Sequence, residues 1–486
     1  MPVNERFLEK AEKLKKELLH QSVTAESDGR ELNSGDEVIF DFGDHYVGYV
    51  SCELIPSRHH QDAPLYLQFQ FAEIKEELAS NYSDYHGWIS SSWIQDERVH
   101  VDVLPAVLHL ERRYAFRYVR IRVLAASDNY SVRIPKLTAD TVSSADYAKV
   151  TYPALSDRDS RIDEIALRTL HSCMQDVFED GPKRDRRLWL GDLRLEALAN
   201  YQTFRNYDLV KRCLYLFAGS TLEQGRLASN VFITPTVECD YQSMFDYTLF
   251  FISVLWDYYQ ATGDRETLED LEPVCLKQHE LLKNSFEENG LLDMKKAGMV
   301  FVDWNFELDK QAAGQAIYIY ALNDLIGIEK ALNRSASELE RELTDRKQAA
   351  LKLLDSETGL FVSGENKQMS VASQIWMILA EVLTAEEGRD VIMRMNEHPE
   401  IIKLNSPYGY HHLIQAMINV GMKDEAHDLM QKYWGGMADR GSDTFWEIYN
   451  PENPEESPYG GLVVHSFCHA WSCTPTYFLR KYFYNK

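Results

Sequence analysis

The sequence predicts a mainly α-helical protein in which a small antiparallel β-sandwich domain precedes an (α/α)6 barrel. Two observations support this fold class. Short runs of β-branched and aromatic residues, often alternating with polar ones, occupy residues 36–150, and after Pro153 they give way to helical periodicity that continues to the end. We therefore expect an N-terminal helix in residues 1–22, the β-sandwich in 30–150 and the barrel in 151–486.

The first 150 residues contain one candidate helix and five candidate strands. Apolar residues recur at helical spacing between positions 4 and 20, from Phe7 to Leu19, which predicts an amphipathic helix. The strand candidates are bounded by Gly, Pro, Asn and Asp, which favour turns. They cover residues 38–54, 64–74, 98–105, 114–126 and 130–139.

The rest of the chain carries twelve candidate helices. Gly263 and Gly290 follow two of them, Pro407 precedes another, and Ser335 with Glu338 has the spacing of a capping box. Twelve helices joined as antiparallel hairpins can close into a barrel of six inner and six outer helices. A solenoid would instead repeat every 30 to 50 residues or so, and no such period is visible. The candidates are 158–179, 192–206, 208–219, 242–261, 265–287, 311–333, 336–355, 370–384, 386–396, 408–420, 423–435 and 461–482.

Composition and charge restrict the function. The chain has 486 residues, of which 45% are hydrophobic and 12% aromatic, enough apolar surface for a folded core. Its formal charge of −25 argues against nucleic-acid and anionic-membrane partners, whose binding sites gather Lys and Arg. No 18 uncharged apolar residues are consecutive, and the start shows no signal-peptide run, so we expect a soluble cytoplasmic protein.

The seven cysteines are scattered, odd in number and without a CxxC pair. This pattern predicts buried free thiols rather than disulfides or a zinc site. The adjacent His411 and His412 have no third ligand at suitable spacing. No metal and no other cofactor are therefore expected.

Several linkers between the candidate helices are longer than packing requires, and they combine acidic with aromatic residues. Solvent-facing loops do not normally collect Trp, Tyr and Phe, so we expect these loops to line a pocket at one end of the barrel. The linkers are residues 179–191, 220–241, 292–310, 356–369 and 436–460.

Such a pocket suits a small neutral carbohydrate. Aromatic rings stack on the apolar faces of a sugar ring, while carboxylates, Arg and His pair with its hydroxyls. Hydrolysis of a glycoside also needs two carboxyl groups, one to protonate the leaving oxygen and one to activate water or attack directly. Residue types alone do not decide which pair acts. The pocket candidates are Trp189, Trp304, Trp446 and Trp471 among Asp180, Asp192, Asp303 and Glu447.

The run DGPKRDRRLWLGD, at residues 180–192, resembles the signature of the α-L-rhamnosidases of glycoside hydrolase family 78, typically D-x-P-x-R-E-x-x-x-W-x-G-D. Further segments are similar to motifs of that family in the same order, so the resemblance covers about residues 36–486. They are FDFG (40–43) and RYAFRYVRI (113–121) in the β-sandwich, and FVDW (301–304), SPYGYHH (406–412), DTFWE (443–447) and SFCHAWSCTPTYFL (466–479) in the barrel.

The resemblance implies an inverting glycoside hydrolase that cleaves terminal α-L-rhamnose, or a similar sugar, from oligosaccharides or glycosides. The family's general acid falls on Asp185 and its base on Glu447, with the attacking water between Glu447 and the anomeric carbon. The carboxylates that flank the acid fall on Asp180 and Asp192. The other residues expected to bind the sugar are Arg184, Trp189, Asp303, Trp304, Trp446, His469 and Trp471.

Two features depart from the family pattern. Asp185 stands where the family has Glu, and its carboxyl group reaches roughly 1.5 Å less far, a misplacement that costs on the order of a hundredfold in rate. The chain also stops after the last candidate helix, where family members continue into a β-domain. We expect short glycosides as substrates, and a homo-oligomer that covers the surface left by that domain.

Other interpretations stay open. A sugar-binding or regulatory protein with a degenerate barrel would account for Asp185, and an α/α-barrel hydrolase or lyase of another sugar, such as an unsaturated uronate, would need basic residues in the pocket. The charges of residues 180–187 also fit a salt-bridged loop. Glu447 fits a surface position, and His469 and Trp471 fit a packed core.

Overall fold

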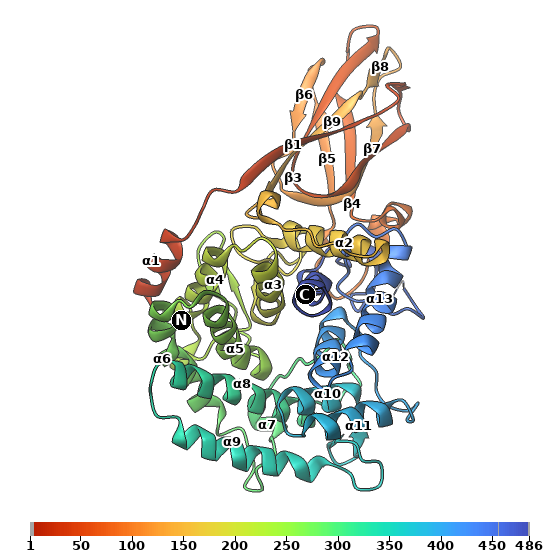
Figure 1. Cartoon of the computed structure of the whole chain (residues 1–486). Helices are drawn as coiled ribbons and strands as arrows, with labels where there is room; N and C mark the ends of the chain where they lie inside the picture. Colours follow the sequence, from red (N-terminus) through yellow and green to blue (C-terminus); the bar gives the residue numbers. More distant parts are fainter. Residues whose placement is uncertain (1–3, 455, 485–486) are drawn as a thin grey trace.

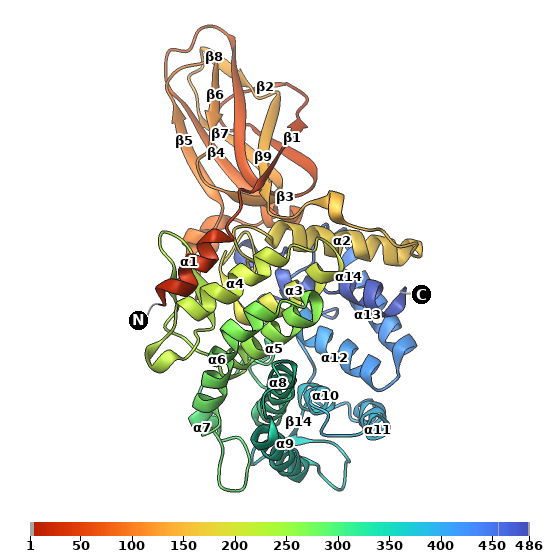
Figure 2. The same ribbon diagram turned by 60° about the vertical axis from the view of Figure 1, so that its left-hand side comes forward.

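The structure is a computed structural model that describes residues 4–454 and 456–484. A β-sheet domain stands on one end of a larger helical domain (Figure 1). Helix α1 (Glu5–Lys13) precedes the sheet in sequence but packs on the helical domain, against α4 (Tyr207–Gly219) (Figure 2). The helix predicted over residues 4–20 is therefore too long, because Leu19 already begins strand β1.

The nine strands of the β-sheet domain form one antiparallel sheet in the order β1-β9-β3-β7-β4-β5, with β2, β6 and β8 paired beside this path. Strand β3 is 22 residues long and pairs along its length with β7, β9, β6 and β8, so one strand ties the whole domain together. The strands are β1 (Leu19–Glu26), β2 (Glu31–Leu32), β3 (Glu37–Arg58), β4 (Leu65–Ala72), β5 (Asp96–Val101), β6 (Ala106–His109), β7 (Tyr114–Ala125), β8 (Tyr130–Arg133) and β9 (Lys136–Ser143).

Aromatic and branched side chains on the inner face of the sheet make the core of this domain. Phe71 stacks on Tyr114 with ring centroids 3.8 Å apart, and Phe116 packs edge-on against Phe71. Each of the five predicted runs overlaps a strand, but 98–105 extends past the end of β5 at Val101. The run 130–139 is divided because Pro135 cannot donate a ladder hydrogen bond. Strand β1 is not predicted, because most of its side chains are exposed at the sheet edge.

The helical domain is a barrel in which consecutive elements alternate between an outer and an inner ring. Helices α3, α5, α8, α10 and α12 contact one another in sequence as the inner ring, and the C-terminal turns close it between α12 and α3. The antiparallel β-domain followed by a six-hairpin barrel confirms the predicted fold class. The helices are α2 (Asp157–Cys173), α3 (Leu190–Gln202), α4, α5 (Phe245–Thr262), α6 (Arg265–Leu282), α7 (Met294–Ala297), α8 (Gln311–Ala331), α9 (Ser337–Ala350), α10 (Val371–Leu379), α11 (Ala385–Met395), α12 (Pro407–Asn419), α13 (Lys423–Asp439) and α14 (Pro475–Phe478).

The last candidate helix, 461–482, is wrong as a single element. It divides into the 3-10 turns Leu462–Val464 and Ala470–Cys473, then α14, then a π-helical turn over Leu479–Phe483. Residues 465–469 between them are irregular because their backbone bonds to other segments: Ser466 O accepts from Glu447 N, and His469 N donates to Phe445 O. These tertiary hydrogen bonds replace those of a helix.

Helix-end signals were partly right. Gly263 ends α5 in the left-handed region, with φ 69°, and Pro407 is the first residue of α12. The capping box of Ser335 and Glu338 does not form, because α9 begins at Ser337, one residue later than predicted, and its N-cap is Ala336, which has no capping side chain. All seven cysteines are buried, as predicted.

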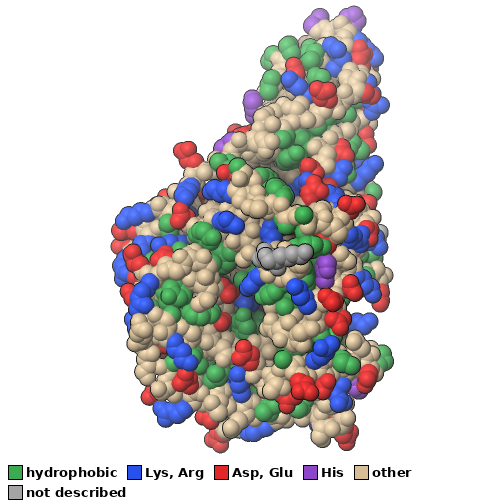
Figure 3. All heavy atoms as spheres, in the orientation of Figure 1, with side chains coloured by type: hydrophobic (Ala, Val, Ile, Leu, Met, Phe, Trp, Pro, Cys, Tyr) green, Lys and Arg blue, Asp and Glu red, His purple; other side chains and the backbone are tan. Residues whose placement is uncertain are grey.

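The described residues lack two features that would indicate a membrane or a metal. No helix among them is both long and apolar enough to cross a membrane, and no group of three or more His, Cys, Asp or Glu side chains among them is arranged to hold a metal ion. On the face shown in Figure 3, Lys and Arg alternate with Asp and Glu over the helical domain. That face presents no continuous basic patch of the kind that nucleic acid requires.

Candidate active site

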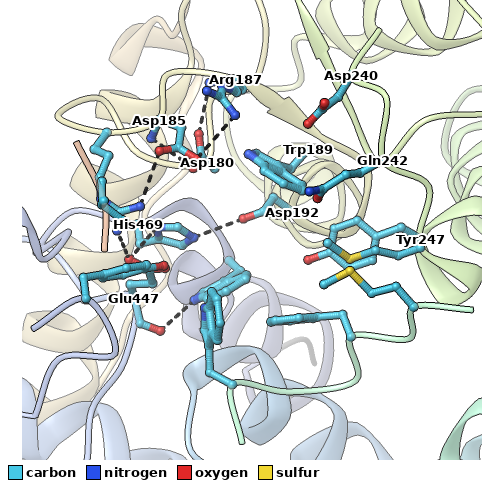
Figure 4. Close-up of a pocket in the computed structure, with 18 of the residues that line it drawn as sticks. Asp180, Asp185, Arg187, Trp189, Asp192, Asp240, Gln242, Tyr247, Glu447 and His469 are labelled. Atoms are coloured by element: carbon cyan, nitrogen blue, oxygen red, sulfur yellow. Dashed lines mark hydrogen bonds and ion pairs between the residues drawn. The ribbon is translucent and has the colours of Figure 1, made fainter. Parts of the chain in front are cut away.

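A cavity of about 590 Å³ lies where the loops of the barrel meet the β-sheet domain. Ten of the eleven predicted site residues line it, and Figure 4 labels several of them. They come from four predicted motifs of the barrel, at residues 180–192, 301–304, 443–447 and 466–479. Asp185 and Glu447, 262 positions apart in sequence, face this one cavity. The loop that follows α2 supplies residues 180–189, and the first turn of α3 supplies Asp192.

The carboxylate of Asp180 shapes the loop that presents Asp185. Its two oxygens accept hydrogen bonds from the backbone N–H groups of Arg187, at 3.0 Å, and of Asp185, at 3.2 Å. The backbone N–H of Asp180 donates to Arg187 O, and its carbonyl accepts from Ala470 N at 2.7 Å. Asp180 itself is buried, whereas 19% of the Asp185 side chain is exposed. The loop therefore turns Asp185 outward and keeps Asp180 behind it.

Asp180 favours its protonated form. Burial is the main cause, and the neighbouring carboxyls of Asp185 and Asp192 add like charge, so the pKa of Asp180 is raised to about 8 although His469 opposes the shift. At neutral pH this corner of the cavity holds a proton. A carboxyl that is neutral near pH 7 is what general acid catalysis requires.

Glu447 is shifted in the opposite direction. Burial opposes its ionisation, but the guanidinium of Arg184 and the rings of His469 and His465 outweigh it and lower the pKa of Glu447 to about 2. Arg184 Nη2 donates to Glu447 Oε2 at 2.5 Å, and the Tyr459 hydroxyl donates to Oε1. Glu447 is therefore a carboxylate throughout the neutral range.

Arg184 separates the two predicted catalytic carboxyls. Its Nη1 lies 3.5 Å from Asp185 Oδ1, while its Nη2 contacts Glu447. Its Nε donates to Val464 O at 2.8 Å, and its guanidinium lies 4.0 Å from the ring centroid of Tyr459. This buried arginine fixes the acid loop against the segment that carries Glu447.

His469 lies between the acid loop and Glu447 (Figure 4). Its Nε2 is 3.2 Å from Asp192 Oδ1, and its Nδ1 is 3.9 Å from Glu447 Oε2. Burial lowers the pKa of His469, but the charges of Glu447 and Asp192 outweigh this and raise it. Burial raises the pKa of Asp192, which His469 partly offsets.

Aromatic rings form the remaining walls. Phe301 contacts Trp304 edge-on and stacks near Trp471, with centroids 5.4 and 5.8 Å apart respectively. The indole nitrogens of Trp189 and Trp304 and the Nδ1 atom of His469 have no hydrogen-bond partner among the described residues, although they are buried. Unpaired polar groups in an aromatic cavity are suited to the hydroxyls of a sugar.

Asp303 lines the cavity and also holds the start of α12 in place. Its carboxylate accepts from Asn405 N at 2.6 Å and from the Ser406 hydroxyl, the residue that caps α12. Burial raises the pKa of Asp303 to about 6, against these hydrogen bonds. Gly409 leaves room for this carboxylate, since an added Cβ would lie 3.3 Å from Asp303 Cγ.

Trp446, which was expected to bind the sugar, is not among the residues that line the cavity. Its ring packs edge-on against Phe467 and Tyr449, with centroids 5.1 and 5.7 Å apart. The side chain of Trp446 therefore packs in the core, whereas that of its neighbour Glu447 faces the cavity.

Several residues that line the cavity were not among the predicted site residues, and two groups of them are instructive. Tyr459, which donates to Glu447, lies in the linker 436–460 that was expected to line the pocket, but its role depends on tertiary contact. Trp88 and Trp93 come from the β-sheet domain, in the long connection between β4 and β5. The length of that connection and its tryptophans could have indicated a part in the pocket.

Two family models match the chain. The N-terminal domain of glycosyl hydrolase family 78 α-rhamnosidases matches residues 8–141. The bacterial α-L-rhamnosidase six-hairpin glycosidase domain matches residues 156–483, about two thirds of the sequence. The chain belongs to glycoside hydrolase family 78, the α-L-rhamnosidases. Among curated proteins, no sequence matches it.

Solved structures agree with this membership. A Klebsiella oxytoca rhamnosidase with rhamnose bound is 42% identical, with a TM-score of 0.95 over 99% of both chains. A family 78 rhamnosidase of Bacillus sp. GL1 is 21% identical, with a TM-score of 0.77 over 92% of this chain and 46% of that one. A Streptomyces avermitilis α-L-rhamnosidase complexed with L-rhamnose is 16% identical, with a TM-score of 0.71 over 96% and 44%. The latter two show likeness of fold, and this family 78 chain spans about half their length.

Proposed function

We propose that this family 78 glycosidase is an inverting α-L-rhamnosidase that removes terminal α-L-rhamnose from short oligosaccharides or glycosides. The observation that carries the proposal is that Asp185 and Glu447 face one cavity with aromatic walls. The raised pKa of Asp180, beside Asp185, and the lowered pKa of Glu447 support it. The rhamnose bound to the 42% identical Klebsiella protein supports the choice of sugar.

In the proposed reaction, Glu447 accepts a proton from a water molecule as the oxygen of that water forms a bond to C1 of the sugar. The bond from C1 to the aglycone oxygen breaks at the same time, and Asp185 donates a proton to that oxygen. The products are the free alcohol and rhamnose of inverted configuration. Asp192, His469 and the two unpaired indole N–H groups are placed to bind the sugar hydroxyls.

Asp185 is the better candidate for the donor than Asp180. Its side chain is partly exposed, while the oxygens of Asp180 are occupied by backbone N–H groups of the loop. We propose that Asp185 delivers the proton to the leaving oxygen, while Asp180 holds the loop in place behind it. Asp185 then acts despite being shorter than the glutamate of the family pattern.

The test is a panel of aryl glycosides followed by proton NMR of the first-formed sugar. We expect hydrolysis of aryl α-L-rhamnosides and the β anomer as first product. Asp185→Asn should lower kcat on phenyl α-L-rhamnoside by about a hundredfold or more. First formation of the α anomer, or undiminished turnover in this variant, would overturn the mechanism.

A sugar-binding protein with a degenerate barrel predicts a different result. Such a protein would bind L-rhamnose without releasing the aglycone from any member of the panel. An enzyme acting on uronates is disfavoured by the charge of the cavity, which six carboxyls line beside three basic side chains. The carboxyls belong to Asp180, Asp185, Asp192, Asp240, Asp303 and Glu447, and the basic groups to Arg184, Arg187 and Lys310.

We also propose that the enzyme works in the cytoplasm and forms a homo-oligomer. Six buried cysteines that are free thiols support a reducing compartment: Cys52, Cys173, Cys213, Cys275, Cys468 and Cys473. Cell fractionation tests the location, and light scattering coupled to size-exclusion chromatography tests the assembly. A mass of a single chain at micromolar concentration would contradict the oligomer.

A further inference from the structure

A buried charge cluster joins the β-sheet domain to the acid loop. Glu73, directly after β4, and Glu77, in the 3-10 turn Lys75–Ala79, both contact the ammonium group of Lys183, at 3.1 and 2.9 Å. His45 of β3 lies 3.1 Å from the other oxygen of Glu73. All four side chains are at most 3% exposed.

Glu73 contacts both segments that carry the proposed chemistry. Through Lys183 it holds the loop two residues before Asp185. Its Oε2 also accepts from the backbone N–H of Phe467 at 2.8 Å, two residues before His469. The neighbouring Ser466 carbonyl accepts from the N–H of Glu447 at 3.0 Å. One carboxylate of the β-sheet domain therefore ties the acid loop to the segment that pairs with Glu447.

The cluster is rigid as well as buried. Glu77 Oε1 accepts from the backbone N–H groups of Glu73 and Ile74, which fixes the turn that carries both glutamates. His45 Nδ1 lies 3.2 Å from the Ser172 hydroxyl on α2, so the cluster is also attached to the barrel. Burial lowers the pKa of Lys183, but the two glutamates outweigh it and raise that pKa. The ammonium thus stays charged between them.

We infer that Glu73 and Lys183 are positioning residues through which the β-sheet domain sets the place of Asp185 relative to Glu447. This inference rests on the proposed rhamnosidase mechanism. Lys183, Arg184 and Asp185 are consecutive, so a shift of the ammonium group moves the acid directly. A displacement of about 1 Å costs on the order of a hundredfold in rate.

The test uses two substrates that differ in their need for an acid. Phenyl α-L-rhamnoside requires protonation of its leaving oxygen, whereas the 2,4-dinitrophenyl rhamnoside does not. Lys183→Met leaves the contact between Glu73 and Phe467 in place. We expect it to lower kcat on the phenyl substrate by roughly 30- to 100-fold and on the dinitrophenyl substrate less than about threefold, with the Kd for L-rhamnose within about twofold.

Glu73→Ala removes the contacts to Lys183 and to the N–H of Phe467, together with the contact to His45. It should lower kcat on both substrates by roughly tenfold or more, because the segment that pairs with Glu447 shifts as well. Adding Lys183→Met to it should cost little more, since the pair acts as a unit. Lys183→Arg should restore part of the phenyl activity. If Lys183→Met does not fold, Lys183→Arg serves instead, with a smaller loss that keeps the same dependence on the leaving group.

Arg480→Met is the matched control. Arg480 forms a buried ion pair with Asp163, with Nη2 2.9 Å from Oδ2, and neither residue lines the cavity. We expect it to lower the melting temperature without changing the ratio of the two kcat values. An unchanged ratio in Lys183→Met would overturn the inference. Absence of rhamnoside hydrolysis in the unmodified enzyme would instead overturn the proposed function.

Discussion

Asp180 and Glu447 are buried carboxyls of one cavity, yet their ionisation is shifted in opposite directions. Asp180 lies near Asp185 and Asp192, so like charge adds to burial and its pKa is raised to about 8. Glu447 is just as buried, but Arg184 and two histidines lower its pKa to about 2. The comparison teaches that the charged neighbours, and not burial, decide which carboxyl holds a proton in this cavity.

The largest expected effect comes from removing the charge of Glu447, the ionised carboxyl of the two. Glu447→Gln should lower kcat on aryl α-L-rhamnosides by roughly a thousandfold or more, because an amide cannot accept the proton of the attacking water. Steady-state kinetics measures the loss, and circular dichroism checks that the fold is kept. Glu452→Gln, at an exposed position of the same linker, should turn over normally. Equal activity in both variants would remove Glu447 from the mechanism.

The second prediction concerns Arg184, which lies between Asp185 and Glu447. In Arg184→Met, burial would act on Glu447 without its main opposing charge, so its pKa should rise above the ordinary value of about 4.3. Because the base must be ionised, activity should then fall as the pH decreases through about 5, whereas the unmodified enzyme should hold its activity there. The pH profile of kcat/KM tests this.

Arg187→Met supplies the control for that profile. Arg187 Nη1 lies 3.9 Å from the carboxyl of Asp185, and no contact to Glu447 is found among the described residues. The acidic limb of the kcat/KM profile of Arg187→Met should match that of the unmodified enzyme. Identical acidic limbs in both arginine variants would contradict the assigned cause of the Glu447 shift.

The third prediction concerns the protonated side. With a pKa of about 8 in the folded protein, and about 3.9 in the unfolded chain, Asp180 binds a proton on folding between these values. The free energy of unfolding should therefore decrease as the pH rises from about 4 to about 8, with a slope of up to about 1.4 kcal/mol per pH unit. Asp180→Asn should flatten that slope and move the alkaline limb of kcat/KM. Urea unfolding at several pH values measures the slope. If Asp180 were ionised in the folded protein, the slope would be the same in Asp180→Asn as in the unmodified protein.

The smallest effect is expected from a tryptophan that lies beside the site but outside it. Trp446→Phe should leave kcat/KM within about twofold and cost about 1–3 kcal/mol in the free energy of unfolding, because the ring packs in the core. Trp471→Phe, on the cavity wall, should raise KM roughly fivefold to tenfold. The reverse order of these two KM effects would place Trp446 in contact with the substrate.

Much of the site could be predicted because the chemistry is concentrated in short motifs. Asp180, Arg184, Asp185, Trp189 and Asp192 occupy one run of thirteen residues, and the structure places all five on the cavity. Local spacing determines which of these side chains share a loop and a first helical turn, so the motif is legible without coordinates.

Contacts between distant segments were not predictable in the same way. The irregular stretch 465–469 looks helical from its composition, yet its backbone bonds to Phe445 and Glu447. The position of Trp446 was equally hidden, because its packing against Phe467, 21 residues later in the sequence, is a tertiary contact.

The sequence by itself determined the order of the two domains, the alternation of helices that makes the barrel, and the carboxyls and aromatic residues available for sugar chemistry. Only the tertiary structure decided which carboxyl keeps its proton and how the β-sheet domain reaches the site through Glu73 and Lys183. The physical reason is range: periodicity and spacing act over a few residues, whereas a pKa and a buried ion pair depend on charges brought within a few ångströms from distant parts of the chain.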